Sequence, residues 1–358
     1  MSFLNLHEVE ALARATLPAA TFEYFAGGAC DEVTLSANRR AFDEIALRYR
    51  VLVDVRRREL ATTLLGTPVA APIVIAPMAF QRLAHPEGEL GTARAAAALG
   101  LVMTASTFST CSLEEIAAIP GAPRWFQLYV HQDRGITGEL VQRAAAAGYQ
   151  ALVLTVDVPE IGRRERDERN TFRLSADLRV ANFVPRMSEA IQGDAPGSGS
   201  QLARFIEGMR DPSFAWKDLE WLRSLSTLPL VLKGLVRADD ARRAVEYGAA
   251  GIVVSNHGGR QLDTAIAGIR ALPEVVDAVG DEALVMVDGG IRRGTDVLKA
   301  LALGARAVML GRPVLWGLAV GGEAGARRVL ELLRNELDLA MALCGTPRLS
   351  DLSPDLLA

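Results

Sequence analysis

A histidine, an aspartate and two arginines stand just behind short apolar runs of the sequence. His257 lies in SNHGGRQLD, directly after GIVV, and Asp157 follows ALVLTV. An imidazole in such a place can take up a proton near neutral pH, and a carboxylate beside it can orient the ring and stabilise the imidazolium. A packed core histidine is the alternative, but Gly258, Gly259 and Arg260 beside it favour a reactive site. We predict that His257 is a general base and Asp157 its partner.

Two arginines follow the same two runs and point to recognition of a carboxylate. Arg164 lies in GRRERDERN and Arg260 in HGGRQLD. Two guanidinium groups can each bind a carboxylate through forked, charge-assisted hydrogen bonds. Taken alone, Arg164 also fits a solvated helix, since charged residues crowd around it. Its neighbour Arg163 we interpret as structural.

A phosphate site is indicated by VDGGIRRG and ALGARAVMLGR, the segments that carry the last two apolar runs. Gly289 and Gly290 let backbone N–H groups approach an anion, and Arg292 and Arg312 can bind it with forked donors. The alternative is two glycine turns with two surface arginines.

Lysine is rare in this chain, with only Lys217, Lys233 and Lys299 among 39 basic residues. Lys233 ends the run LPLVLKG, where a compact ammonium suits a cofactor that gains negative charge on reduction. A Schiff-base lysine, as in barrel aldolases, is the rival interpretation. The paired arginines and His257 argue against it, because an aldolase does not need them.

The elements that must position these residues alternate regularly. Runs of four to six Val, Ile and Leu residues are typical of strands buried on both faces, and Ala-rich amphipathic stretches between them are typical of helices. Eight such units predict an α/β fold, the (β/α)8 TIM barrel, whose active sites lie at the C-terminal ends of the strands. A doubly wound open sheet is the alternative. The apolar runs begin at Pro72, Leu101, Trp125, Ala151, Leu228, Gly251, Ala283 and Arg306.

The whole chain, residues 1–358, is expected to be one domain. Residues 1–70 read as a helical N-terminal cap and residues 71–345 as the barrel. Residues 165–215 interrupt the barrel after its fourth strand with a polar segment that contains GDAPGSGSQ. Breaks of that length are often lids over a site.

Composition narrows the partners and the compartment. The formal net charge is −4 and the pI about 5.7, which does not favour nucleic acid or an anionic membrane. We expect no signal peptide, because the first residues contain acids and have no long apolar run, and no membrane span, because no stretch of about 18 uncharged apolar residues is present. Cys30, Cys111 and Cys344 are far apart, so we expect free thiols, no metal site and a cytoplasmic protein.

Taken in order, six motifs resemble the FMN-dependent family that oxidises L-2-hydroxy acids, which includes glycolate oxidases, lactate oxidases and mandelate dehydrogenases. The resemblance runs from about residue 5 to residue 350. Its motifs are YFAGGACDEVTLSANRRAF, APMAFQRLAHPEGE, WFQLYV, TVDVPEIGRRERDERN, SNHGGRQLD and VDGGIRRGTDVLKALALGA.

The resemblance implies FMN as cofactor and a role for each matching residue. His257, paired with Asp157, would be the general base, Lys233 would face the flavin, and Tyr129 would hydrogen-bond the substrate hydroxyl. Tyr24, Arg164 and Arg260 would bind the substrate carboxylate. The other residues implied in FMN binding are Pro77, Met78, Ala79, Ser106, Gln127, Thr155, Ser255, Asp288, Gly289, Gly290, Arg292, Gly311 and Arg312.

Differences between this sequence and other members of the family indicate its substrate and its electron acceptor. Phe108 stands where glycolate oxidases tend to carry Trp, so with Met78, Phe80 and Ile161 it would form a roomier apolar wall. Such a wall favours an aromatic side chain, as in (S)-mandelate or (S)-4-hydroxymandelate, over lactate or a longer aliphatic acid. Without a haem domain or an apolar membrane loop, O2 is the expected acceptor and H2O2 the product, and the resemblance implies a homotetramer.

The resemblance leaves two matters open. The substrate's carbon can lose a proton or a hydride. The remaining alternatives are another FMN barrel, such as an isopentenyl diphosphate isomerase or an inosinate-type dehydrogenase, and a flavin-binding scaffold without turnover. Neither needs the two arginines beside a histidine.

Overall fold

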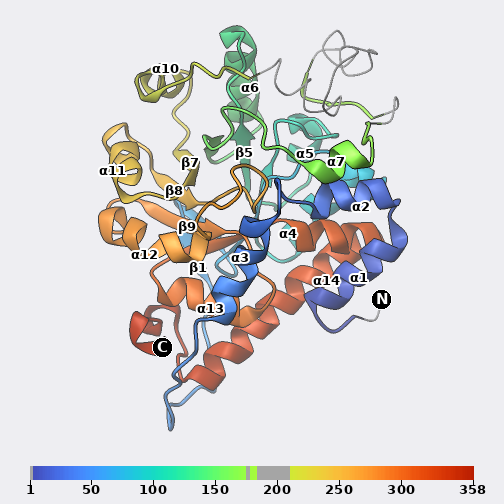
Figure 1. The fold of residues 1–358 in the computed structure, drawn as a ribbon. Coiled ribbons are helices and arrows are strands. Elements are labelled where there is room, and N and C mark those ends of the chain that lie inside the picture. Colours follow the sequence, from blue (N-terminus) through green and yellow to red (C-terminus); the bar gives the residue numbers. More distant parts are fainter. Residues whose placement is uncertain (1–2, 175–177, 184–209) are drawn as a thin grey trace.

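Eight parallel strands close into a barrel in a computed structural model that describes residues 3–174, 178–183 and 210–358. The barrel is continuous because the last strand pairs with the first, Val308 opposite Ile73. Figure 1 shows strands in the middle of the molecule with helices around them. The prediction of a TIM barrel is confirmed, and the open sheet is wrong. The strands are β3 (Ile73–Ile75), β4 (Val102–Ala105), β5 (Arg124–Leu128), β6 (Leu152–Thr155), β7 (Leu230–Leu235), β8 (Gly251–Val254), β9 (Leu284–Asp288) and β10 (Ala307–Leu310).

Alternation of side chains along each strand explains why the runs are apolar throughout. Val74 belongs to a cluster in the barrel interior that also holds Trp125, Val153 and Met309. Its neighbour Ile73 belongs to the larger cluster between the strands and the surrounding helices. Because successive side chains point to opposite faces, both faces of each strand must be apolar.

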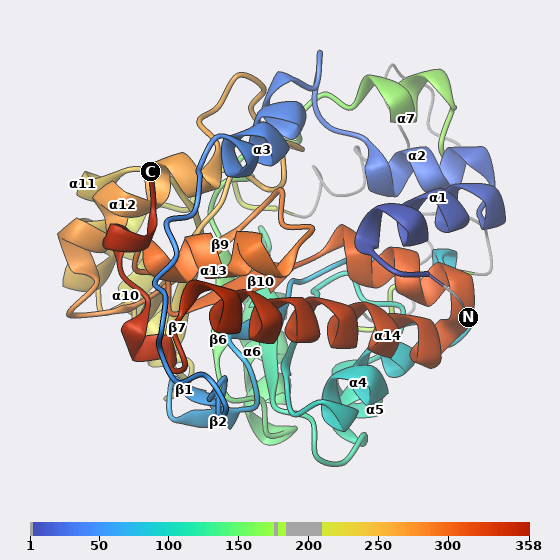
Figure 2. The ribbon, with the colours of Figure 1, turned by 90° about the horizontal axis from the view of Figure 1, so that it is seen from below.

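Helices surround the barrel, and one of them spans its underside. The C-terminal helix α14 (Arg312–Cys344) packs against α1 (Leu6–Thr16), α4 (Gly88–Ala98) and α13 (Gly294–Ala302) and crosses below the strands (Figure 2). It is broken at Gly321 and Gly322, which have non-helical backbone angles. The barrel helices are α4 (Gly88–Ala98), α5 (Leu113–Ala117), α6 (Arg134–Ala146), α10 (Leu219–Ser224), α11 (Ala238–Glu246), α12 (Gly268–Val279), α13 (Gly294–Ala302) and α14 (Arg312–Cys344). Short 3₁₀ turns are η1 (Gln81–Leu83), η2 (Trp216–Asp218), η3 (Leu349–Asp351) and η4 (Pro354–Leu356).

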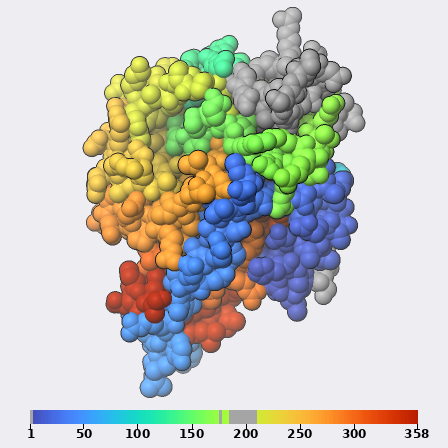
Figure 3. Space-filling model, in the orientation of Figure 1, coloured from blue at the N-terminus to red at the C-terminus, as the bar shows by residue number. Residues whose placement is uncertain are grey.

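The N-terminal cap is helical only as far as residue 43. It consists of α1 (Leu6–Thr16), α2 (Ala19–Ala26) and α3 (Val33–Asp43), which lie in blue against the barrel in Figure 3. The rest differs from the prediction, because β1 (Thr62–Leu64) and β2 (Thr67–Val69) form an antiparallel pair. Leu64 and Val69 join the interior cluster of the barrel, so this hairpin contributes to the core rather than to a helical cap.

The predicted insertion is described only in part. It contains a short helix, α7 (Glu165–Arg169), which packs against α2. Residues 175–177 and 184–209, including GDAPGSGSQ, lie outside the described residues, so the lid stays a prediction. Among the described residues no helix is long and apolar enough to cross a membrane, and none of the three cysteines is in a disulfide.

Candidate active site

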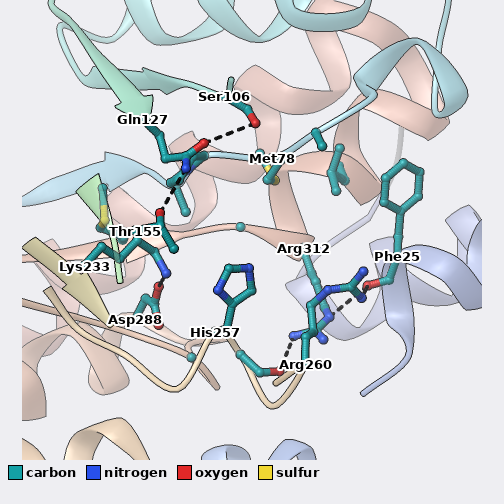
Figure 4. Close-up of a pocket in the computed structure, with 18 of the residues that line it drawn as sticks. Phe25, Met78, Ser106, Gln127, Thr155, Lys233, His257, Arg260, Asp288 and Arg312 are labelled. Carbon is teal, nitrogen blue, oxygen red and sulfur yellow. Dashed lines mark hydrogen bonds and ion pairs between the residues drawn. The ribbon is translucent and has the colours of Figure 1, made fainter. Parts of the chain in front are cut away.

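One pocket at the C-terminal ends of the barrel strands brings most of the predicted residues together (Figure 4). Three predicted residues do not line it: Asp157, Ser255 and Arg292. The first two contact residues that do, and the third lies in a small adjoining pocket behind Gly290. The predicted residues that line the pocket are Tyr24, Pro77, Met78, Ala79, Phe80, Ser106, Phe108, Gln127, Tyr129, Thr155, Ile161, Arg164, Lys233, His257, Arg260, Asp288, Gly289, Gly290, Gly311 and Arg312.

His257 is held in the pocket by its backbone and by Asp157. Its φ of +59° is left-handed, an unusual conformation for a non-glycine residue that is often found at functional sites. Its backbone N–H donates to Ser255 Oγ at 3.0 Å, and its Nδ1 lies 3.0 Å from Asp157 Oδ1. Burial lowers the pKa of His257 below its ordinary value, although Asp157 opposes this. The ring is therefore neutral at neutral pH and able to accept a proton.

Asp157 carries the charge that this pairing requires. Burial alone would raise the pKa of Asp157, but its pairing and hydrogen bond with His257, together with the charge of Lys233, hold that pKa below its ordinary value. Its Oδ2 has no hydrogen-bond partner within the described part of the chain. An ionised carboxylate next to the ring stabilises the imidazolium that forms when His257 accepts a proton.

Lys233 is a buried ammonium with two partners. Its Nζ lies 2.9 Å from Asp288 Oδ2 and donates to Ser255 Oγ at 2.9 Å. Burial would lower the pKa of Lys233, but Asp288 and Asp157 outweigh it and raise the pKa. A Schiff-base lysine needs a neutral amine, so this environment does not support the aldolase interpretation.

A line of amide and hydroxyl groups borders the pocket beside Lys233. Gln127 Nε2 donates to Thr155 Oγ1 at 3.0 Å, while Gln127 Oε1 accepts from the backbone N–H of Thr107 at 3.2 Å and from Ser106 Oγ at 3.4 Å. These bonds fix the amide in one orientation, so Gln127 presents defined polar atoms to the pocket (Figure 4).

The glycine loop after β9 allows a ligand to come close to the protein backbone. Gly289 and Gly290 have φ values of +88° and +83°, and a Cβ on Gly290 would lie 2.1 Å from the carbonyl oxygen of Asn38. Asp288 Oδ1, just before them, has no hydrogen-bond partner among the described residues. Glycine is required here by both conformation and space.

Arg312 lines one end of the pocket and also the small adjoining pocket that holds Arg292, and the two arginines favour an anion there. Arg312 donates to the carbonyl oxygens of Phe25, Gly27 and Gly258 at 2.9–3.0 Å. Burial, with the charges of Arg260 and Arg292, lowers the pKa of Arg312 to about 9. Burial also lowers the pKa of Arg292, whose Nε lies 3.8 Å from Glu10. A bound phosphate would stabilise the buried positive charges of Arg312 and Arg292.

Arg260 and Arg164 form a second positive centre, from two different loops. Arg260 Nη1 donates to the carbonyl oxygens of Tyr24 at 2.8 Å and Gly27 at 2.9 Å, and its guanidinium lies 5.3 Å from the centre of the Tyr24 ring. Burial and the charge of Arg164 lower the pKa of Arg260 to about 10. Asp167 is 3.9 Å from Arg164 Nη1. A carboxylate would relieve the repulsion between the two arginines.

An aromatic and aliphatic wall completes the pocket. The ring of Phe108 lies 6.2 Å from that of Phe80 and 5.5 Å from that of Tyr129, centre to centre. Ile161 and Met78 extend the same lining. Burial raises the pKa of Tyr129 above its ordinary value, so its hydroxyl stays protonated and can donate a hydrogen bond.

The prediction missed several residues of the pocket, most of which were within motifs already quoted. Phe25 adjoins Tyr24 and its carbonyl binds two arginines, while Gln261 follows Arg260. Main-chain acceptors leave no mark on residue type, but Gln261 could have been found as a polar residue beside the predicted pair. The missed lining residues are Phe25, Ala76, Val158, Gly258, Gln261, Ile291, Met309, Leu310 and Leu315.

The other histidines do not belong to the catalytic group. His85 Nδ1 accepts from the backbone N–H of Glu87 at 3.3 Å, and His131 Nδ1 from that of Asp133 at 2.8 Å. Both therefore cap local turns, as expected for histidines outside a site. His7 lines the small pocket near Arg292.

The chain belongs to the family of FMN-dependent dehydrogenases, whose sequence pattern it matches over residues 13–358. It is 56% identical to an L-lactate oxidase from Nostoc sp., covering 99% of this chain and 98% of the relative. A glycolate oxidase of Spinacia oleracea is 48% identical over 99% and 95% of the two chains. A crystal structure of mandelate oxidase with (S)-4-hydroxymandelic acid superposes with a TM-score of 0.94 at 46% identity, covering 99% and 98%.

The protein is therefore an FMN-dependent enzyme of 2-hydroxy acid oxidation. The residues that line the pocket fit FMN. The glycine loop and the arginines suit its phosphate. Asp288 Oδ1, unpartnered within the described chain, suits a hydroxyl donor of the ribityl chain, and the ammonium of Lys233 suits a ring system that gains negative charge. A flavin-binding scaffold without turnover and a Schiff-base aldolase are set aside by family membership.

Proposed function

We propose that the enzyme oxidises (S)-2-hydroxy acids with an aromatic side chain, above all (S)-mandelate and (S)-4-hydroxymandelate, to the 2-oxo acids. O2 takes up the two electrons and two protons and leaves as H2O2. The observation that carries the proposal is the His257–Asp157 pair, 3.0 Å apart, in a pocket that also holds Arg164 and Arg260. A base and two carboxylate binders are the set that a 2-hydroxy acid requires.

Each residue has a defined part in this proposal. Arg164 and Arg260, with Tyr24, bind the substrate carboxylate, and Tyr129 donates a hydrogen bond to the substrate oxygen. His257 accepts a proton from the substrate at its Nε2, and Asp157 stabilises the resulting imidazolium through Nδ1. When bound, FMN accepts the two electrons that leave the substrate.

The cofactor would be held by the remaining predicted residues. Lys233 would lie against the flavin ring, where its ammonium stabilises negative charge. Arg292 and Arg312 would bind the phosphate beside Gly289 and Gly290. The other proposed FMN contacts are Pro77, Met78, Ala79, Ser106, Gln127, Thr155, Ser255, Asp288 and Gly311.

The pH dependence of the proposed base has a definite sign. Since burial holds the pKa of His257 below its ordinary value of about 6.5, the neutral ring persists into mildly acidic solution. We expect the acid limb of kcat/KM, where the ring becomes protonated, to have its midpoint below about pH 6.5. A pH profile of anaerobic flavin reduction measures this directly. An acid limb centred above about pH 6.5 would contradict the assignment.

Substrate preference rests on the wall of Phe80, Phe108 and Ile161. We expect (S)-mandelate to exceed L-lactate and glycolate in kcat/KM. Burying a phenyl ring instead of a methyl group is worth about 2 kcal/mol, or about 30-fold. Steady-state assays with H2O2 detection check the order.

Lactate is the second candidate substrate, because the Nostoc relative at 56% identity is an L-lactate oxidase. A kcat/KM for lactate or glycolate above that for (S)-mandelate would contradict the aromatic proposal and leave the chemistry intact. A homotetramer and a cytoplasmic location also remain predictions, and light scattering of the purified protein tests the first.

A further inference from the structure

The side chain of Gln261 binds three backbone groups of a neighbouring loop. Its Nε2 donates to the carbonyl oxygens of Asp157 at 3.2 Å and Glu160 at 2.8 Å. Its Oε1 accepts from the N–H of Gly162 at 3.3 Å. Gln261 is buried, so both ends of the amide act as hydrogen-bonding groups away from water, where each bond is costly to lose.

Gly162 shows independently how closely the two loops approach. A Cβ at this position would lie 2.5 Å from the carbonyl oxygens of both Arg260 and Gln261. Contacts that short do not occur, so any larger residue at position 162 must push the loops apart. The loop after β6 and the loop after β8 are therefore in direct backbone contact where Gln261 binds.

The two loops carry opposite halves of the proposed machinery. The loop after β6 contains Asp157 and Arg164, and the loop after β8 contains His257 and Arg260. The His257–Asp157 contact at 3.0 Å crosses between them. Arg164 and Arg260 line the same pocket from these two loops. Burial, and then the like charge of Arg164, lower the pKa of Arg260, so contacts between the loops must offset that repulsion before a carboxylate arrives.

We propose that Gln261 is a positioning residue that fixes the distance between these two loops. It thereby sets both the alignment of Asp157 with His257 and the spacing of the two arginines. The inference rests on the proposed function and adds a specific requirement to it. An amide meets this requirement, because its NH2 group can donate to both carbonyl oxygens while its own oxygen accepts from the N–H.

The first test reads the loop itself and needs no substrate. Hydrogen exchange of the FMN-loaded protein is followed by mass spectrometry in peptides covering residues 156–168. We expect faster exchange in Gln261→Met, which keeps the length of the side chain and loses all three bonds. Leu262→Ala is the matched control, because Leu262 is the next residue and is 74% exposed. Exchange in Gln261→Met equal to that of the wild type would overturn the proposal.

The second test reads the consequence for catalysis. In Gln261→Met we expect kcat/KM for (S)-mandelate to fall about 10- to 100-fold at unchanged FMN content, the range expected for a displacement near 1 Å. Affinity for the 2-oxo acid product, from a flavin spectral titration, should fall with it, because both arginines move. Wild-type values for both would overturn the positioning role even if exchange were faster.

Gln261→Glu separates positioning from a general loss of stability. The new carboxyl group faces two carbonyl oxygens, so its ionised form repels them and its protonated form can still donate to one. We expect its kcat/KM relative to the wild type to rise as pH falls, whereas Gln261→Met should show no such trend. The proposed function is tested separately, and it fails if no 2-hydroxy acid reduces the wild-type flavin. The hydrogen-exchange test of Gln261 needs no substrate, so its result holds in either case.

Discussion

His257→Ala should retain FMN and lose flavin reduction by 2-hydroxy acids by several orders of magnitude. The imidazole is the one neutral base in the described lining of the pocket that is paired with an ionised carboxylate, Asp157, at 3.0 Å. Its removal leaves no group to accept the substrate's proton, and loss of a general base typically costs 10²–10⁴-fold or more. Anaerobic stopped-flow measurement of the bleaching of the flavin gives the rate.

Two controls accompany this variant. The visible spectrum shows whether FMN is still bound, which we expect because His257 makes its hydrogen bonds to Ser255 and Asp157 and not to Arg292 or Arg312. His131→Ala is the matched histidine variant, because His131 only caps a turn at Asp133, and it should reduce at nearly the wild-type rate. A rate near that of the wild type in His257→Ala would remove His257 from the proposed mechanism.

Arg260→Ala should lower kcat/KM by an amount equivalent to about 2–5 kcal/mol, as expected when one partner of a buried ion pair is removed. The guanidinium is anchored by the carbonyl oxygens of Tyr24 and Gly27 and lies in the pocket beside Arg164. We expect the loss in KM and in the affinity for the product 2-oxo acid, because the substrate carboxylate loses one of two binding groups. Steady-state kinetics and a flavin spectral titration measure the two quantities.

Arg163→Ala is the matched control for the arginine variants. Arg163 adjoins Arg164 in sequence, but its side chain is 65% exposed and pairs with Glu168. It should keep the wild-type kcat/KM. Arg260→Lys retains the positive charge but loses the forked donors of the guanidinium. It is a control for misfolding, and its kcat/KM should lie between those of the wild type and Arg260→Ala. An unchanged kcat/KM in Arg260→Ala would exclude Arg260 from the substrate site.

The barrel was predictable because its strands are buried on both faces. A run such as ALVLTV has no polar face, so its character does not depend on knowing its neighbours. The hairpin of β1 and β2 was missed for the opposite reason. Its strands have three residues each and contain Thr62, Thr63 and Pro68, too little periodicity to identify. Their place under the barrel depends on Leu64 and Val69 meeting the interior, which is a tertiary property.

The site could be predicted where it is formed by distinctive side chains. His257, Lys233 and Arg312 follow apolar runs, and the parallel sheet brings the ends of those runs together. The carbonyl oxygens of Phe25 and Gly27, which hold Arg260 and Arg312, leave no such mark. Neither does the contact of Gly162 with the loop after β8, because it depends on how two distant loops meet.

The most direct test of the central claim is an anaerobic titration of the purified protein with (S)-mandelate, followed in the visible spectrum before air is admitted. We predict a yellow protein that bleaches as substrate is added and recovers its colour in air with release of H2O2. Bleaching without recovery would contradict O2 as the acceptor. A flavin that none of (S)-mandelate, L-lactate and glycolate can bleach would contradict the proposed reaction itself.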